Sequence, residues 1–280
     1  MNTLTRRQFL RSTAAVAGLA WGAAAQESRQ WREIGLQVFT IRKSLQEDWE
    51  KTLRRVAEIG YNTLEMGAYF GESPAAFKAF LQEIGLKVIS GGGSIGALRA
   101  NLSQLIDQSL AMEKEYLVCF WPWEGSMEGK TIDDWRRLAE ELNAIGEKVK
   151  RSGLRFAYHN HDIEFQPTEG RIPFDVLLQE TDPTMVGIEL DIYWMVKGNR
   201  QPIDYLESYP GRFPLWHVKD MDATPQRGFA CVGEGVIDFP AIFKRAERAG
   251  LRHIFVENDE PKDELACIKT SCEYLRAMRY

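Results

Sequence analysis

Hydrophobic and polar positions along the chain follow two alternating patterns. Short runs of mostly apolar and often β-branched residues recur eight times, and none is longer than nine residues. Runs of this length and composition are typical of parallel strands that are buried on both faces. The predicted strands span residues 34–39, 63–67, 87–91, 116–121, 155–161, 186–194, 215–220 and 253–259.

Longer amphipathic segments lie between these runs. In residues 49–59 the side chains of Leu53, Val56 and Ile59 share one helical face. The same spacing predicts helices over residues 132–149, 239–249 and 265–278. Several of these segments end at a glycine suited to a helix C-cap, after which the next apolar run begins; these glycines are Gly60, Gly85, Gly153 and Gly250.

Eight strand–helix units predict one α/β domain, a closed (β/α)8 TIM barrel over residues 26–280. The alternative is an open, doubly wound sheet that binds a nucleotide. No GxGxxG follows the first predicted strand, and no GxxxxGK[ST] occurs anywhere, so the sequence favours the barrel. Gly91, Gly92 and Gly93 are expected to form a tight turn after the third strand.

The first 25 residues are expected to be an export signal. The sequence TRRQFLR at residues 5–11 precedes a weakly hydrophobic run and an alanine triplet at residues 23–25. Paired arginines, an apolar segment and an A-x-A cleavage site are the parts of a twin-arginine signal peptide. We therefore expect the twin-arginine translocase as a partner, and a periplasmic or secreted location for the domain.

Composition narrows the classes of partner. The formal net charge of -5 argues against nucleic acid, which needs a basic face. No apolar stretch of about 18 residues follows residue 26, so no membrane span is expected in the mature chain. A homo-oligomer remains open. The four cysteines form no CxxC pair and are expected to be small buried residues without a disulfide; they are Cys119, Cys231, Cys267 and Cys272.

Polar residues gather at the ends of the last four predicted strands. The sequences are YHNHDIE at 158–164, ELDIYW at 189–194, HVKD at 217–220 and END at 257–259. Active sites of (β/α)8 barrels lie at these strand ends. Carboxylates with one or two imidazoles suit a hard divalent cation, which can polarise a carbonyl and ease removal of a neighbouring proton.

The chain resembles the sugar phosphate isomerase/epimerase family, whose fold is a xylose isomerase-like barrel. The resemblance is carried by IGLQVFTIR, YHNHDIEF, VGIELDIYWMVKGNRQP, WHVKDMD, VGEGVIDFPAIF and HIFVEND. It implies a divalent metal, most often manganese, with magnesium, iron, cobalt or zinc as alternatives. By motif, Asp191, His217 and Glu257 match three ligands. The family's remaining ligand is a glutamate in the fifth strand, where we align Tyr158. Glu164 is the expected fourth ligand, with His161 as the alternative.

The resemblance implies an isomerase or epimerase that removes a proton next to the carbonyl of a sugar or keto-sugar. Catalytic roles are expected for Glu257, Glu164 and His161. Contacts with the carbohydrate are expected from Lys219, His159, Trp194 and Tyr158.

Two other functions stay open. Epimerases of this family use two glutamates, and a tyrosine in one place favours one-sided chemistry. That would make the protein a dehydratase or lyase acting on keto-inositols or keto-glycosides. A sugar-binding barrel without catalysis is the other alternative. An endonuclease on this fold would need a histidine-rich zinc site, which four histidines and an acidic chain disfavour.

Overall fold

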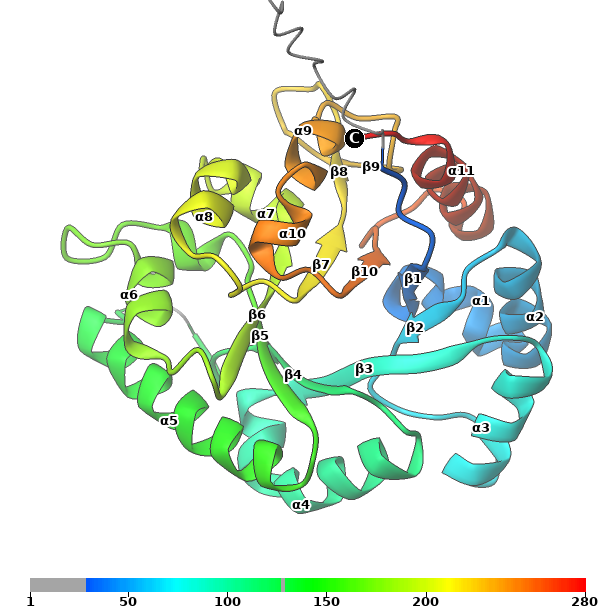
Figure 1. The fold of residues 1–280 in the computed structure, drawn as a ribbon, viewed down its shortest axis with the longest axis horizontal. Helices are drawn as coiled ribbons and strands as arrows, with labels where there is room; N and C mark the ends of the chain where they lie inside the picture. The colour runs from blue at the N-terminus through cyan, green and yellow to red at the C-terminus, as the bar shows by residue number, and fades with distance from the viewer. Residues whose placement is uncertain (1–28, 127–128) are drawn as a thin grey trace, which may run out of the picture.

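The computed structural model describes residues 29–126 and 129–280. Eight parallel strands close into a barrel with helices packed around it (Figure 1), as the sequence predicted. The strand order around the barrel is β1-β10-β7-β6-β5-β4-β3-β2. The expected export signal lies outside the described residues.

The barrel strands are β1 (Ile34–Gln37), β2 (Thr63–Glu65), β3 (Lys87–Ser94), β4 (Tyr116–Trp121), β5 (Arg155–His159), β6 (Val186–Asp191), β7 (Leu215–Val218) and β10 (His253–Val256). A small antiparallel ribbon after β7 pairs β8 (Asp220–Met221) with β9 (Phe229–Ala230).

The α-helices are α1 (Arg42–Glu47), α2 (Trp49–Ile59), α3 (Pro74–Glu83), α4 (Ile95–Ala111), α5 (Ile132–Arg151), α6 (Pro173–Glu180), α7 (Ile192–Lys197), α8 (Pro202–Ser208), α9 (Phe239–Phe243), α10 (Ala246–Ala249) and α11 (Glu264–Ala277). Two 3-10 turns, Val38–Ile41 and Ile163–Phe165, follow β1 and β5. No helix in the described part of the chain is long and apolar enough to cross a membrane.

Four of the sequence expectations need correction. The sixth strand ends at Asp191 because this residue caps α7, its side chain accepting a hydrogen bond from the backbone N–H of Trp194. The predicted helix over 239–249 is two short helices, α9 and α10. The glycine run belongs to β3, where a Cβ on Gly92 would lie 1.8 Å from the carbonyl oxygen of Val118. Glycine there lets neighbouring strands approach closely.

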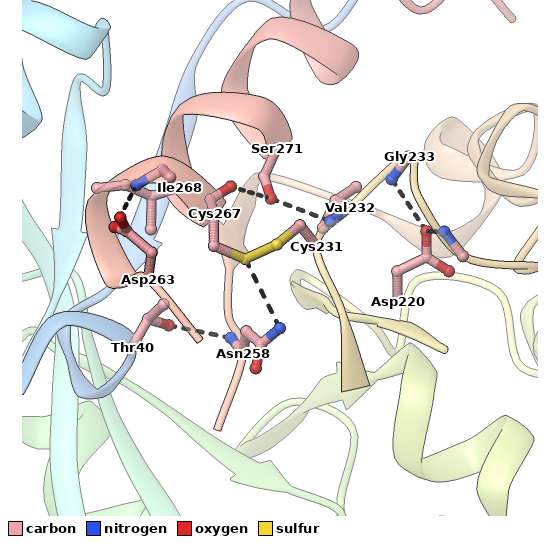
Figure 2. The surroundings of a disulfide bond; sticks show 12 residues. Thr40, Asp220, Cys231, Val232, Gly233, Asn258, Asp263, Cys267, Ile268 and Ser271 are labelled. Carbon is pink, nitrogen blue, oxygen red and sulfur yellow. Dashed lines mark hydrogen bonds between the residues drawn. A yellow bond between two sulfur atoms is a disulfide. The ribbon is translucent and has the colours of Figure 1, made fainter. Parts of the chain in front are cut away.

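The fourth correction concerns the cysteines. Cys231 and Cys267 form a disulfide, with Cα atoms 5.3 Å apart, whereas Cys119 and Cys272 are buried thiols as expected. The bond ties the loop after β9 to the start of α11 (Figure 2). Sequence spacing could not reveal this pair, because 36 positions separate the two residues and only the barrel closure brings them together.

The core has two parts. Aromatic and aliphatic side chains fill the space between the strands and the helices, including Trp135, Phe174 and Trp216. A smaller cluster fills the barrel interior and is built from Ile89, Tyr116, Val118, Ala157, Leu215 and Phe255. This interior cluster is the plug of the barrel. Between the plug and the carboxyl ends of the strands the inward side chains are polar, so the plug forms the floor of the candidate site.

Candidate active site and metal centre

The alternation of side chains along each strand decides which polar residues of the last four barrel strands point into the barrel. Successive side chains of a strand point to opposite faces. Ala157 belongs to the interior plug, so His159 also points inward, whereas Tyr158 packs in the outer core. The inward residues at the mouth are His159 from β5, Glu189 and Asp191 from β6, His217 and Lys219 from β7, and Glu257 and Asp259 after β10.

His159, Asp191 and His217 form one group that could hold a metal ion, with ligand atoms within 4.8 Å of one another. Asp191 Oδ2 lies 3.8 Å from His217 Nδ1 and 3.9 Å from His159 Nε2. Glu257 Oε2 lies 2.9 Å from His217 Nδ1, next to this group. The structure thus brings together the three predicted ligands Asp191, His217 and Glu257, and adds His159 to them.

The donors of this group fit a divalent cation. Asp191 Oδ1 accepts a hydrogen bond from the backbone N–H of Trp194, whereas Asp191 Oδ2 is buried and faces the Lys219 ammonium, 3.1 Å away. Buried polar atoms in proteins are almost always satisfied, yet Glu189 Oε1, behind this group, is buried without a hydrogen-bond partner, which suits a site that binds a further polar group or ion. Two imidazoles and two carboxylates are ligands that zinc, iron and manganese accept.

Two buried carboxylates stand behind the imidazoles. Glu65 Oε1 lies 2.6 Å from His217 Nε2. Glu189 Oε2 lies 3.3 Å from the same nitrogen and 3.2 Å from His159 Nδ1. Glu65, Glu189 and His217 also form a second group with metal-ligand spacing. Carboxylates placed in this way orient ligating histidines and fix their tautomers, leaving His217 Nδ1 and His159 Nε2 for the metal.

Burial and the charges of neighbouring groups shift the pKa values of Glu65 and Glu189. Burial, together with the negative charge of Glu65, raises the pKa of Glu189 well above its usual value. Burial acts against ionisation of Glu65 too, but the His217 imidazole outweighs it and lowers the pKa of Glu65. Gln37 and Ser90 donate hydrogen bonds to the Glu65 carboxylate and hold it in place.

Lys219 provides a fixed positive charge at the mouth. Its Nζ atom lies 3.1 Å from Asp191 Oδ2, 2.8 Å from Glu257 Oε2 and 2.9 Å from Asp259 Oδ1. Burial alone would lower the pKa of Lys219, but these carboxylates outweigh it and raise the pKa above its normal value. The ammonium group therefore stays charged and can face a substrate oxygen.

His161 is the predicted catalytic residue that reaches the cavity without an acidic partner. Its ring lies between Trp121 and Trp194, with centroids 5.0 and 5.8 Å away, and its Nδ1 atom has no hydrogen-bond partner. Burial lowers the pKa of His161 to about 3. The imidazole is neutral at pH 7 and can accept a proton.

The structure does not bring Glu164 and Tyr158 to the mouth. Glu164 accepts hydrogen bonds from the Tyr158 hydroxyl and from the backbone N–H of His161, and it belongs to neither metal-ligand group. Tyr158 is fully buried in the outer core, where it has no access to a substrate. The alignment from sequence placed Tyr158 at the ligand position of β5, one residue too early. In the structure His159 is the residue of β5 that points inward. Burial raises the pKa of Glu164 to about 7.

Trp194 does not line the main cavity. It is partly buried, with Lys219 Nζ 5.4 Å from its ring centroid and Phe229 5.7 Å away. This position lets it shape the sides of the site around His161 and Lys219. A direct contact with carbohydrate stays a prediction.

The loop that follows Lys219 is fastened at several points. The Asp220 carboxylate accepts hydrogen bonds from the backbone N–H groups of Gly233, Gly235 and Ile237. The disulfide lies beside it, and the Asn258 amide contacts the sulfur of Cys267 (Figure 2). Since Asn258 directly follows Glu257, the cross-link stabilises the segment that carries a candidate ligand.

These residues open into one cavity of about 640 Å³ at the carboxyl ends of the strands. Its polar lining includes His159, His161, His217, Lys219, Glu257 and Asp259. A cavity of this size is within the usual range for small-molecule sites.

Comparison with known proteins agrees with this geometry. Residues 53–278 match the family described as xylose isomerase-like TIM barrel. The chain belongs to that family.

Among relatives of known function, an inosose dehydratase from Geobacillus kaustophilus is 26% identical over 234 residues, which cover 70% of this chain and 75% of the relative. A sugar phosphate isomerase/epimerase structure from Parabacteroides distasonis is 27% identical, with a TM-score of 0.76 and coverage of 88% of this chain and 94% of the other. The IolI protein with a bound zinc atom has a TM-score of 0.70 and 12% identity over 86% of this chain and 95% of its own; it shows a shared fold.

Sequence reasoning missed three residues of this site. Glu65 is the last residue of β2, and Glu189 lies two residues before Asp191 on β6, so the alternation of side chains along a strand would have placed Glu189 on the same inward face as Asp191. Asn160 follows His159 directly. Its amide oxygen accepts from the backbone N–H of Asp191, and its amide nitrogen donates to the carbonyl oxygen of Asp191, so it locks β5 against β6.

Proposed function

We propose that the protein is a divalent-metal-dependent lyase or dehydratase that acts on a cyclic keto-sugar or keto-polyol. The observation that carries this proposal is the residue on β5. The inward residue of β5 is His159, which lies beside the carboxylates of Glu189 and Asp191, and not a second glutamate that could act as a base. The similarity to inosose dehydratases supports the same choice.

His159, Asp191, His217 and Glu257 would hold the metal. A divalent ion there would polarise the substrate carbonyl and acidify the neighbouring C–H bond. The zinc bound by the IolI protein, which shares this fold, supports a metal in this protein, and manganese and zinc are both compatible with the donors. Glu65 and Glu189 would keep both imidazoles in the ligating tautomer.

His161 would transfer the proton, and Lys219 would stabilise the negative charge. His161 lines the cavity and has a nitrogen without a hydrogen-bond partner, so it is the group placed to accept the proton from the carbon beside the carbonyl. The electrons of that C–H bond form a C=C bond as the C–O bond at the next carbon breaks. The imidazolium, whose low pKa makes it a good acid, returns the proton to the departing oxygen. Lys219 faces the oxygen on which negative charge develops.

A second candidate is an epimerase, favoured by the similarity to the Parabacteroides distasonis protein. Glu257 and His161 would then be the two bases on opposite sides of one carbon. Glu257 Oε2 lies 2.8 Å from Lys219 Nζ and 2.9 Å from His217 Nδ1, so these two groups already occupy the carboxylate oxygen that would have to accept the proton. Elimination is therefore the function that the site supports better.

We further propose that the protein is exported. The twin-arginine motif suggests this route, and the Cys231–Cys267 disulfide supports it, because such bonds persist in oxidising compartments. A substrate without phosphate fits that location.

Two measurements test the proposed function. Protein purified without chelators should contain about one equivalent of a divalent metal by mass spectrometry. The metal-loaded protein should then eliminate water or alcohol from a keto-inositol or a 3-keto-glycoside, followed by NMR. A metal-free protein that binds sugars without converting them would indicate the non-catalytic barrel.

A further inference from the structure

The candidate cavity has two chemically different halves. Strands β5, β6, β7 and β10 and the residues directly after them carry the candidate metal group, Lys219 and His161. Strands β1 to β4 and the segments after them carry mostly apolar side chains to the same cavity. These are Val38, Phe39, Leu45, Phe70, Phe120 and Trp121. Because the strands form a closed ring, the two halves face each other across one opening.

The apolar half is larger than a keto-sugar ring requires. The whole cavity of about 640 Å³ falls in the size range that encloses drug-sized ligands. A single six-membered polyol ring has hydroxyl groups on every side, whereas the polar side chains that the apolar half brings to the cavity are Gln37, Arg42 and Gln46 and the rest of its side chains are apolar. The apolar half therefore fits a part of the substrate that lies beyond the sugar ring.

The aromatic rings in this half are held in fixed positions. Phe70 stacks on Trp49 with ring centroids 5.7 Å apart and planes 9° from parallel. Phe39 is 48% exposed, and the Arg42 guanidinium lies 4.2 Å from its ring centroid. Arg42 also donates a hydrogen bond to the carbonyl oxygen of Phe39, and this bond stabilises the 3-10 turn that carries the Phe39 ring. Rings ordered in this way are prepared to receive a flat apolar group.

We propose that the substrate is a keto-glycoside whose apolar, aromatic aglycone binds between Phe39 and Phe70 while its sugar ring faces the metal group. This inference rests on the proposed function and names its substrate class. Elimination then breaks the C–H bond beside the keto group and the C–O bond to the aglycone. The C–H electrons form the C=C bond, and the aglycone leaves as an alcohol that has gained the proton. The apolar half is thus the leaving-group subsite.

The test compares two probes, 4-nitrophenyl 3-keto-β-D-glucoside and methyl 3-keto-β-D-glucoside. The unoxidised 4-nitrophenyl and methyl glucosides serve as non-reacting probes for binding by calorimetry. Phe39→Ala should weaken binding of both nitrophenyl compounds about three- to tenfold, the range of one aromatic contact, and leave the methyl compounds unchanged. Phe39→Tyr should restore nitrophenyl binding. Leu110→Ala is the matched control, since Leu110 is similarly exposed at 45% but lies on α4 outside the cavity.

The outcomes separate the subsite from the chemistry. Equal effects of Phe39→Ala on both probes, no effect on either, or no binding of either probe would overturn the subsite. So would a change of oligomeric state in Phe39→Ala, seen by sedimentation, with no change in probe preference. Preferential nitrophenyl binding that Phe39→Ala abolishes, but without release of nitrophenol from the keto compound, would keep the subsite and refute the proposed elimination.

Discussion

Glu65 holds the back of the His217 imidazole, with Oε1 of Glu65 2.6 Å from Nε2 of His217. This contact leaves Nδ1 to face Asp191 and Glu257. Replacing Glu65 by glutamine should lower metal affinity about 10- to 100-fold, because the charge that orients and polarises the imidazole is lost. Competition with a chelator measures the change.

Glu115→Gln is the matched control for Glu65→Gln. Glu115 Oε2 lies 3.4 Å from His253 Nε2 and so forms another carboxylate–histidine pair, at the start of β10. Its replacement should leave metal affinity unchanged. Equal losses in the two variants would show that Glu65 acts through general electrostatics or folding.

The identity of the fourth ligand is tested by two substitutions. His159→Ala should reduce metal affinity by at least an order of magnitude, because a ligand is removed. Glu164→Gln should leave it unchanged, since its carboxylate is occupied by the Tyr158 hydroxyl and the His161 backbone. The reverse result would return the fourth position to Glu164 and remove His159 from the site.

Glu164 should also make stability depend on pH. Burial raises its pKa to about 7 in the folded protein, whereas in the unfolded chain the value is about 4.3. The folded state therefore binds this proton more tightly, and unfolding free energy falls as pH rises from about 4 to 7. The full loss of unfolding free energy from this group is about 4 kcal/mol above pH 7.

Glu164→Gln removes that titration. Urea unfolding of the metal-free proteins at pH 4.5 and pH 8 should show a smaller loss of stability for the variant than for the wild type. Parallel pH dependence in the two proteins would mean that Glu164 keeps an ordinary pKa.

Export and the disulfide can be tested together. Replacing Arg6 and Arg7 by lysine should retain the protein in the cytoplasm, because the translocase reads the paired arginines. In the exported wild type Cys231 and Cys267 should resist alkylation, and in the retained variant they should react after unfolding. Export of the lysine variant in wild-type amounts would contradict the signal assignment.

The sequence predicts the barrel well because its evidence is local. Apolar runs, amphipathic segments and the C-cap glycines Gly60 and Gly250, with φ of +115° and +75°, each reflect the conformation of a few residues. Polar residues at the ends of apolar strands pointed to the mouth of the barrel, and the resemblance to the family singled out Asp191, His217 and Glu257 as the expected ligands.

What the sequence could not reveal depends on register and on closure of the barrel. A shift of one residue on β5 exchanges Tyr158 for His159, and apolar flanks give no signal that fixes it. The contact between Glu65 and His217 joins strands 152 positions apart. The half-cavity of Phe39 and Phe70 likewise forms only when the first strands meet the last.

The central claim, one-sided elimination at the metal group, is tested most directly by turning over a keto-glycoside in deuterated water and following the product by NMR. The account predicts release of the β-oxygen substituent, with formation of a C=C bond beside the carbonyl. His161→Gln should keep the bound metal and slow this reaction at least 100-fold. Interconversion of two epimers, with deuterium at the inverted carbon and the oxygen substituent retained, would contradict the account.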